Sequence, residues 1–318
     1  MAGLIARILV TGASGFVGSH ALPALRQAFP AAVLIAGVHR RAVQGWDDSL
    51  KLAFDDEAGL RAALVAIRPD AVLHLAAQAN VPASFQDPGG TRAANLDASL
   101  NLARAMLAAV PQARLVFAST GEVYGLSFRD GPAREDTPFQ PTNPYAEAKA
   151  AADTALGEMA AQGLRVVRMR PLNHVGPGQS PGYVMADFAR QVALFEAGRP
   201  ENASLRVGEL DRWRDFLDVR DVCHGYALAL ARFDALENGV AINLASGQAR
   251  RVGDMLEGLL ALAGIRPPIE QAATALRPND VVRTEGDAAR ARALLGWAPR
   301  IEWEDTLRAV LDDWRARV

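Results

Sequence analysis

The chain has 318 residues, of which 50% are hydrophobic and 22% are charged. This composition is typical of a compact globular protein and excludes a disordered or fibrous one. The 34 basic and 36 acidic residues give a net charge of −2, so no overall positive charge favours nucleic acid or an anionic membrane.

The cysteine content and the start of the chain bear on the cellular compartment. Cys223, the one cysteine, excludes an internal disulfide and a thiolate metal cluster, and it is expected to be a small buried helix residue. The segment before Gly12 is too short for a signal peptide, and no apolar run reaches the roughly 18 residues that a membrane span needs. We therefore expect a cytoplasmic protein that binds no metal, no membrane and no nucleic acid.

The first half of the chain alternates apolar, β-rich runs with helical periodicity, which is the pattern of βαβ units in a parallel sheet. Strands are predicted at Ile5–Thr11, Ala32–His39, Asp70–Leu75, Arg114–Ser119 and Leu164–Arg170, with helices at Phe16–Phe29, Glu57–Ile67, Thr91–Ala109 and Tyr145–Gln162. Pro23 is expected to kink the first helix or to mark its late start.

After Pro171 the pattern changes to loops dense in glycine and proline, such as Val175–Gly182, which indicate a site-forming loop. A helix is predicted near Val184–Ala197 and others near Val252–Ala263 and Glu304–Arg317, while a strand at Phe216–Asp218, a helix at Asp221–Arg232 and a strand at Val240–Leu244 are expected to return to the sheet. The fold class is therefore α/β: a Rossmann doubly wound parallel sheet with a smaller, interleaved C-terminal α/β substrate lobe. Residues 1–172 with 213–247 would form the dinucleotide-binding domain, and residues 173–212 with 248–318 the substrate domain.

A glycine-rich turn, Thr11-Gly12-Ala-Ser-Gly15-Phe-Val-Gly18, follows the first strand and opens the first helix. Glycines there let backbone N–H groups approach a pyrophosphate at the helix N-terminus, where the helix dipole favours an anion. The residues predicted to hold the dinucleotide are Gly12, Ser14, Gly15, Phe16, Val17 and Gly18. The alternative is a plain strand-to-helix turn.

Two arginines, Arg40 and Arg41, follow the second strand, where an NAD site would present an acidic residue to the ribose. Guanidinium groups at this point would pair with a 2′-phosphate. The cofactor predicted is therefore NADP, as NADPH, with NAD as the alternative. A solvated basic turn is the other interpretation of the pair.

Tyr145 and Lys149 are spaced i, i+4 and so share one face of a predicted helix. An ammonium about 4 Å from a phenol lowers the phenol's pKa by about three units at an effective dielectric near 20. Tyr145 would then be a usable acid or base near neutral pH. The same spacing also fits a tyrosine packed beside a surface lysine.

Together, these motifs and four further segments resemble the extended short-chain dehydrogenase/reductases. The further segments are Asp55-Asp56, His74-Leu-Ala-Ala77, Asn95 and Ser119-Thr120-Gly-Glu122-Val-Tyr124-Gly125. The resemblance implies that Asp55 or Asp56 contacts the adenine, that the backbone of Leu75, Ala76 and Ala77 lines the cofactor, and that Asn95 belongs to the same site. It also implies that Thr120 hydrogen-bonds the reacting sugar oxygen, Tyr145 transfers the proton and Lys149 holds the ribose. His74 itself is interpreted as a buried strand histidine.

The segment Arg170-Pro-Leu-Asn173-His174-Val-Gly-Pro-Gly-Gln179 is similar to that of the GDP-4-keto-6-deoxy-mannose reductases of this family, with Leu172 in place of phenylalanine. The residues that this likeness implies for the nucleotide sugar are Asn173, His174, Gln179, Arg214 and Arg277, with the arginines on the phosphates. By itself, Arg214 beside Asp215 also fits a surface ion pair.

Gly121 bears on the reaction, because many 4,6-dehydratases of the family have an aspartate or serine at this position as the acid. A reductase needs only hydride and a proton. We therefore predict reduction of GDP-4-keto-6-deoxy-D-mannose to GDP-D-rhamnose or its C4 epimer, with Glu122 on a sugar hydroxyl. The alternatives are a 4,6-dehydratase or 4-epimerase that recycles its dinucleotide, and a non-catalytic NADP-binding sensor. The helices at Thr91–Ala109 and Tyr145–Gln162 resemble the pair that forms the family's four-helix interface, so a homodimer is expected.

Overall fold

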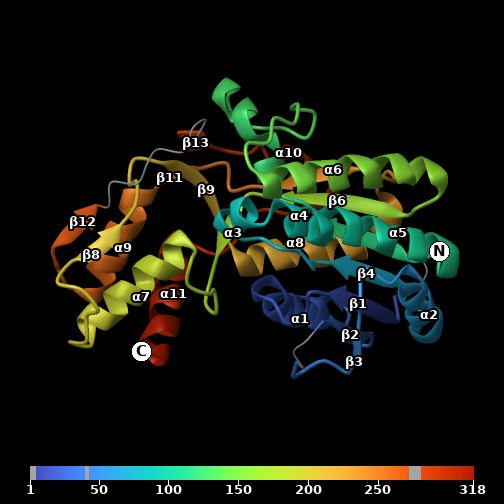
Figure 1. Cartoon of the computed structure of the whole chain (residues 1–318), viewed down its shortest axis with the longest axis horizontal. Helices are drawn as coiled ribbons and strands as arrows, with labels where there is room; N and C mark the ends of the chain where they lie inside the picture. Colours follow the sequence, from blue (N-terminus) through green and yellow to red (C-terminus); the bar gives the residue numbers. More distant parts are fainter. Residues whose placement is uncertain (1–4, 40–42, 272–280) are drawn as a thin grey trace.

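The computed structural model describes residues 5–39, 43–271 and 281–318, and within them a seven-stranded parallel sheet forms the centre of the molecule (Figure 1). The strand order is β10-β6-β5-β4-β1-β2-β3. From β1 the chain adds strands first on one side and then, from β4, on the other, as in a doubly wound sheet. The strands are β1 (Arg7–Thr11), β2 (Val33–Val38), β3 (Asp48–Lys51), β4 (Ala71–His74), β5 (Arg114–Ala118), β6 (Val166–Pro171) and β10 (Ala241–Leu244). The predicted fold class is confirmed.

Helices cover both faces of this sheet, because its strands are apolar on both sides. In β1, Ile8 and Val10 face the cluster that includes α1 (Phe16–Ala28) and α8 (Val219–Ala231). Leu9 points the other way, into the cluster around α2, α5 and α6. The bounds of these three helices are Glu57–Ile67, Ala98–Ala109 and Pro144–Met159. Cys223 on α8 is buried, as predicted.

Two predicted helices differ in detail from the structure. The first begins at Phe16 and includes Pro23, so this proline does not mark a late start. The helix expected at Thr91–Ala109 begins earlier, as α4 (Pro88–Arg92), and passes through one π-helical turn at Ala93–Asp97 before α5. The short helix α3 (Val81–Gln86), which precedes α4, and the strand β3 carry no strong apolar periodicity and were not predicted.

The strand expected at Phe216–Asp218 is present but lies outside the large sheet, so that prediction is wrong. It belongs to β9 (Trp213–Asp218), which pairs with β7 (Asn173–Val175), β11 (Ala249–Arg251) and β13 (Arg283–Thr284). The physical reason is that β10 already occupies the free edge of β6, with Leu244 opposite Pro171. A further pair, β8 (Leu205–Val207) and β12 (Ile269–Gln271), forms a separate small sheet.

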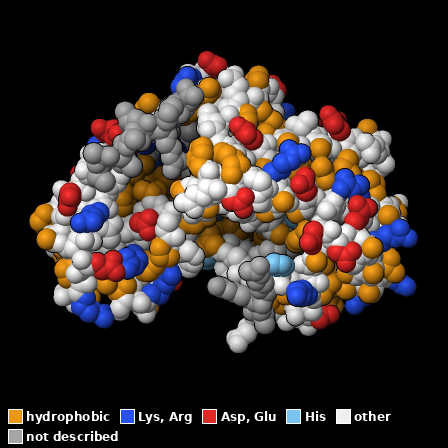
Figure 2. Space-filling model, in the orientation of Figure 1, with side chains coloured by type: hydrophobic (Ala, Val, Ile, Leu, Met, Phe, Trp, Pro, Cys, Tyr) orange, Lys and Arg blue, Asp and Glu red, His pale blue; other side chains and the backbone are white. Residues whose placement is uncertain are grey.

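A third hydrophobic cluster lies apart from the large sheet, between α7 (Val184–Glu196), α9 (Val252–Ala263) and α11 (Trp303–Arg317). In Figure 1 these helices stand together at the left, and Figure 2 shows a deep hollow between them and the part built on the large sheet. The remaining helix, α10 (Ala289–Leu295), packs against β10. The predicted domain boundaries stay a prediction.

Candidate active site

The glycine turn between β1 and α1 leaves no space for side chains at two positions. Gly12 has a φ of +71°, and a Cβ there would lie 2.7 Å from the Ala76 nitrogen. A Cβ on Gly18 would lie 2.5 Å from the Gly12 carbonyl oxygen. Among the described residues no side chain caps α1 at Gly15, so its first amides are available to an anion. This cradle fits the pyrophosphate of a dinucleotide.

The backbone beside this turn is held by a buried hydrogen-bond chain. Thr11 Oγ1 accepts from the Ala76 amide at 3.2 Å and lies 2.7 Å from His74 Nδ1, while His74 Nε2 lies 3.1 Å from Ser99 Oγ. Burial lowers the pKa of His74 to about 3, with a smaller effect from the Lys149 charge, so the ring is neutral. His74 is thus a buried strand histidine, as predicted, and it supports the segment Leu75–Ala77.

Asn95 lies in the π-helical turn, and its side chain joins two segments. Nδ2 donates to the Gln78 carbonyl at 3.0 Å and to the Thr91 carbonyl at 2.9 Å. Within the described part of the chain, Asn95 Oδ1 and Gln78 Oε1 are buried without a hydrogen-bond partner. Buried acceptors of this kind call for donors, so the segment fits a polar ligand such as the predicted cofactor.

The two aspartates predicted to contact adenine occupy different roles. Asp56 caps α2, because its Oδ1 accepts from the Gly59 amide at 2.8 Å. Asp55 is exposed beside it and has no such structural role among the described residues. Of the pair, Asp55 is therefore the better candidate for an adenine contact. Arg40 and Arg41 lie outside the described residues.

The structure brings Thr120 and Tyr145 together. Thr120 follows β5 and caps the short 3-10 segment Gly121–Asp130, and Tyr145 lies in the first turn of α6, which Asn143 caps through the Ala146 amide at 2.8 Å. The Thr120 hydroxyl lies close enough to the Tyr145 phenol to lower its pKa. Both are nearly buried, at 8% and 9% exposed.

Lys149 lies one turn further along α6 and is 3% exposed. Its Nζ donates to the Ala118 carbonyl and stands 4.2 Å from the centre of the Phe117 ring. Burial lowers the pKa of Lys149 to about 7, although the Asp153 carboxylate opposes this. The ammonium thus loses much of its charge at neutral pH.

The pKa of Tyr145 moves in the opposite direction from the one that its spacing from Lys149 predicted. Burial raises it above the usual range of a phenol, and the Glu122 and Tyr183 side chains raise it further, while the Thr120 hydroxyl lowers it. The expected depression is wrong because loss of hydration is the largest effect on both groups of the pair. Tyr145 therefore holds its proton at neutral pH.

Three of the predicted substrate residues lie in β7 and in the loop after it. Asn173 and His174 are half-buried in β7. His174 Nδ1 lies 3.1 Å from the Leu172 carbonyl, and burial lowers its pKa, so the ring is a neutral donor. Gln179 is buried, with Nε2 3.5 Å from the His174 carbonyl and Oε1 unpaired within the described residues. Arg277 lies outside those residues.

Arg214 lies on β9 and donates to the carbonyls of Trp213 at 2.9 Å and Val282 at 3.2 Å. Its neighbour Asp215 is fully buried and accepts from the Ser246 amide at 2.8 Å and the Ser246 hydroxyl at 2.6 Å. Successive strand residues point to opposite faces. The alternative of a surface ion pair between Arg214 and Asp215 is therefore wrong.

Two functional features were missed from the sequence. Tyr183, the residue before α7, lies close enough to Tyr145 to affect its pKa; the signal that could have found it is its place at the end of the glycine-rich loop. Asp153 on α6 is fully buried and pairs with Arg168 at 2.7 Å and Arg170 at 2.8 Å, both from β6.

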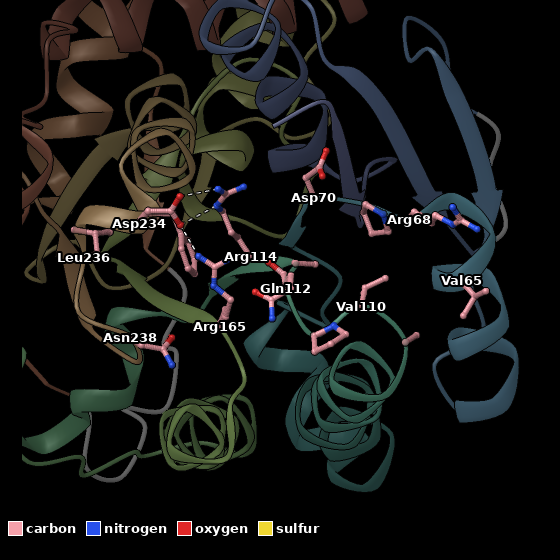
Figure 3. Close-up of a pocket in the computed structure, with 15 residues that line it drawn as sticks. Val65, Arg68, Asp70, Val110, Gln112, Arg114, Arg165, Asp234, Leu236 and Asn238 are labelled. Carbon is pink, nitrogen blue, oxygen red and sulfur yellow. Dashed lines mark hydrogen bonds and ion pairs between the residues drawn. The ribbon is translucent and has the colours of Figure 1, made fainter. Parts of the chain in front are cut away.

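A pocket of about 1170 Å³ lies at the opposite, amino-terminal edge of the large sheet (Figure 3). Arg114 and Arg165 both point to Asp234 there, at 2.7 and 2.5 Å. Of the predicted site residues that the structure describes, none lines this pocket. The described helices also include none both long and apolar enough to cross a membrane.

The doubly wound sheet, the glycine turn and the buried tyrosine and lysine define a dinucleotide-binding α/β enzyme. Residues 8–245 match the family model described as the NAD dependent epimerase/dehydratase family. The chain belongs to this family. The predicted family and the prediction of an NAD(P)-dependent enzyme are confirmed.

Similar proteins agree with this assignment. The chain is 37% identical to the GDP-6-deoxy-D-mannose reductase of Pseudomonas aeruginosa, over 98% of each chain. It is 30% identical to the UDP-glucose 4-epimerase of Azospirillum brasilense, over 92% of this chain and 87% of that protein. Among solved structures, RMD from Pseudomonas aeruginosa complexed with NADPH superposes with a TM-score of 0.86 at 35% identity over the whole of both chains. The UDP-glucose 4-epimerase of Thermus thermophilus with NAD has a TM-score of 0.84 at 29% identity, over 98% and 100% of the chains.

Proposed function

We propose that this protein uses NADPH to reduce the C4 ketone of a GDP-activated 4-keto-6-deoxy sugar, with GDP-4-keto-6-deoxy-D-mannose as substrate and GDP-D-rhamnose as product. The observation that carries the proposal is the likeness to a GDP-6-deoxy-D-mannose reductase along 98% of the chain. The pairing of Thr120 with a protonated Tyr145 supplies the chemistry that such a reduction needs.

When bound, NADPH would supply hydride to C4, and the protein supplies the proton. Tyr145 donates its phenolic proton to the oxygen that becomes the C4 hydroxyl, and its raised pKa suits a group that must arrive protonated. Thr120 donates a hydrogen bond to the phenolate that remains and orients the sugar oxygen. As the phenolate forms, Lys149, buried one turn away, would take up a proton from solvent and so offset that charge.

The surroundings of Gly121 favour reduction over dehydration. A Cβ on Gly121 would lie 2.7 Å from Leu172 Cδ1, so an acid side chain at this position would require Leu172 to shift. A 4,6-dehydratase requires such an acid beside its base. Glu122 is then a contact for a sugar hydroxyl and not half of an acid–base pair.

The remaining site assignments belong to the same proposal. Arg214 with Arg277 binds the diphosphate, Asn173, His174 and Gln179 contact the sugar nucleotide, and Arg40 with Arg41 selects the 2′-phosphate of NADP over NAD. Two copies of the chain would pair through their α4–α5 and α6 segments as a four-helix bundle. Sedimentation that showed only monomer at working concentration would contradict the dimer.

The assay follows nicotinamide absorbance with purified protein, NADPH and a panel of nucleotide 4-keto-6-deoxy sugars. We expect stoichiometric NADPH consumption with the GDP sugar. Conversion of GDP-mannose without net change in the dinucleotide would instead establish a dehydratase. Interconversion of a UDP-hexose at C4 would establish an epimerase, the activity of the relatives at 30% identity. Binding of NADPH without turnover of any of these would favour the sensor.

A further inference from the structure

His20 joins the helix of the dinucleotide site to a distant loop. It lies on α1, one turn after Phe16, and its Nε2 lies 2.8 Å from the Pro177 carbonyl oxygen. A carbonyl can only accept, so Nε2 carries the hydrogen and donates. The bond crosses 157 residues of sequence and connects α1 to the loop of residues 176–182.

Ring contacts reinforce this connection. The Phe16 ring meets His20 edge-on at 5.4 Å and lies parallel to His174 at 6.4 Å with an interplanar angle of 6°. A Cβ on Gly176 would lie 3.6 Å from Phe16 Cζ and 2.5 Å from Val219 Cγ1. The start of the 176–182 loop therefore packs directly on the first turn of α1.

The other side of the 176–182 loop is held by the last turns of α11. Asp313 Oδ2 accepts from the Gly178 amide at 2.9 Å and pairs with Arg317 at the same distance. Arg317 also donates to the Gln179 carbonyl at 3.3 Å. Residues 177–179 are thus fixed between α1 and α11, and the loop leads on to Tyr183, beside Tyr145.

We propose that His20 is a positioning residue for the nucleotide sugar: by holding Pro177, it sets the place of Gln179 and Tyr183 relative to Tyr145. This inference rests on the proposed function. His20 acts on the substrate through the loop, whereas the dinucleotide is held by the glycine turn at the start of α1. Its removal should therefore weaken sugar-nucleotide binding and leave NADPH binding intact.

Three variants test the proposal. His20→Ala removes the donor, and His20→Gln restores an N–H on a side chain of similar reach. Ser19→Ala is the matched control, because Ser19 is the exposed neighbour whose hydroxyl, among the described residues, bonds only to the Phe16 carbonyl within α1. We measure KM and kcat for the sugar nucleotide, the Kd of GDP by calorimetry and the Kd of NADPH by fluorescence.

In His20→Ala, KM and the GDP Kd should rise about 3- to 10-fold, as expected for loss of one uncharged hydrogen bond, with kcat and the NADPH Kd changed less than about twofold. His20→Gln should recover most of the loss. Equal KM and GDP affinity in His20→Ala and Ser19→Ala would overturn the proposal. A parallel rise in the NADPH Kd would also overturn it, since His20 would then act on α1 itself.

The outcomes separate this inference from the proposed function. If the parent protein binds GDP and reduces the sugar but His20→Ala does so equally well, the inference fails alone. If the parent binds neither GDP nor the sugar nucleotide, the proposed function fails and the inference with it. Thermal denaturation of His20→Ala checks that the variant is folded.

Discussion

Replacement of Lys149 by methionine should stabilise the protein while abolishing its turnover. The side chain is 3% exposed, and burial lowers the pKa of the ammonium from 10.5 to about 7. The unfolded chain therefore binds the proton more tightly than the folded protein does. When the chain folds, the protonated side chain of Lys149 loses part of its favourable hydration. Lys149 therefore lowers the free energy of unfolding.

The size of this cost follows from the shift. At 1.36 kcal/mol per pKa unit, it amounts to about 4 kcal/mol at pH 7. Methionine has a similar shape without the charge, but it leaves the Ala118 carbonyl without its donor, which costs about 1–2 kcal/mol. Lys149→Met should thus be more stable than the parent by about 2–3 kcal/mol at pH 7. Its turnover should fall about 100-fold or more.

The stability gap has a defined pH dependence. The cost of Lys149 is complete below its folded-state pKa of about 7 and vanishes above 10.5, where the lysine is neutral in both states. The gap should therefore narrow by about 2 kcal/mol between pH 7 and pH 9. Urea denaturation at both pH values measures it, and Lys51→Met, at the exposed lysine on β3, is the matched control. A stability difference between Lys149→Met and the parent that does not change with pH would refute this account. A variant that is less stable than the parent at both pH values would also refute it.

Three further substitutions test the proposed site. Tyr145→Phe should lower kcat by about 100- to 10,000-fold with the NADPH Kd unchanged, measured by turnover and by fluorescence titration; retained turnover would exclude Tyr145 as the proton donor. Gly12→Ala places a Cβ 2.7 Å from the Ala76 nitrogen at a φ of +71°, so it should weaken NADPH binding at least about tenfold and cost about 1–3 kcal/mol of stability in urea; normal binding would show that the turn can relax. Arg214→Ala should raise the inhibition constant of GDP more than that of guanosine, because the lost contact is to phosphate, and equal effects on both would contradict the assignment. Arg251→Ala is the control for it, since Arg251 pairs with the exposed Asp211 and Asp254.

The sequence predicted those features that depend on local pattern. The strands of the large sheet other than β3, and the helices α2 and α9, were predicted closely because apolar periodicity and caps are local signals. The placement of Thr120 beside Tyr145 was implied by the resemblance to the extended short-chain dehydrogenase/reductases.

The features that were missed depend on contacts between distant segments. The sheet to which β9 belongs was decided by competition for the edge of β6, which no local pattern reports. The direction in which the Tyr145 pKa shifts depends on how completely the Tyr145 side chain on α6 is buried, whereas residue spacing gives only the distance to Lys149. Tyr183 lies close enough to Tyr145 to affect its pKa although nearly 40 residues of chain separate the two, and no local pattern predicts such a contact.

The Asp153 network has a consequence for redesign. Its carboxylate lies one turn after Lys149 and holds α6 to β6 through Arg168 and Arg170. The helix with the proton-transfer residues is therefore held to the large sheet by ionic contacts that do not involve residues 176–182. An engineer who seeks a new sugar preference can vary that loop in a library and leave the reaction geometry on α6 undisturbed.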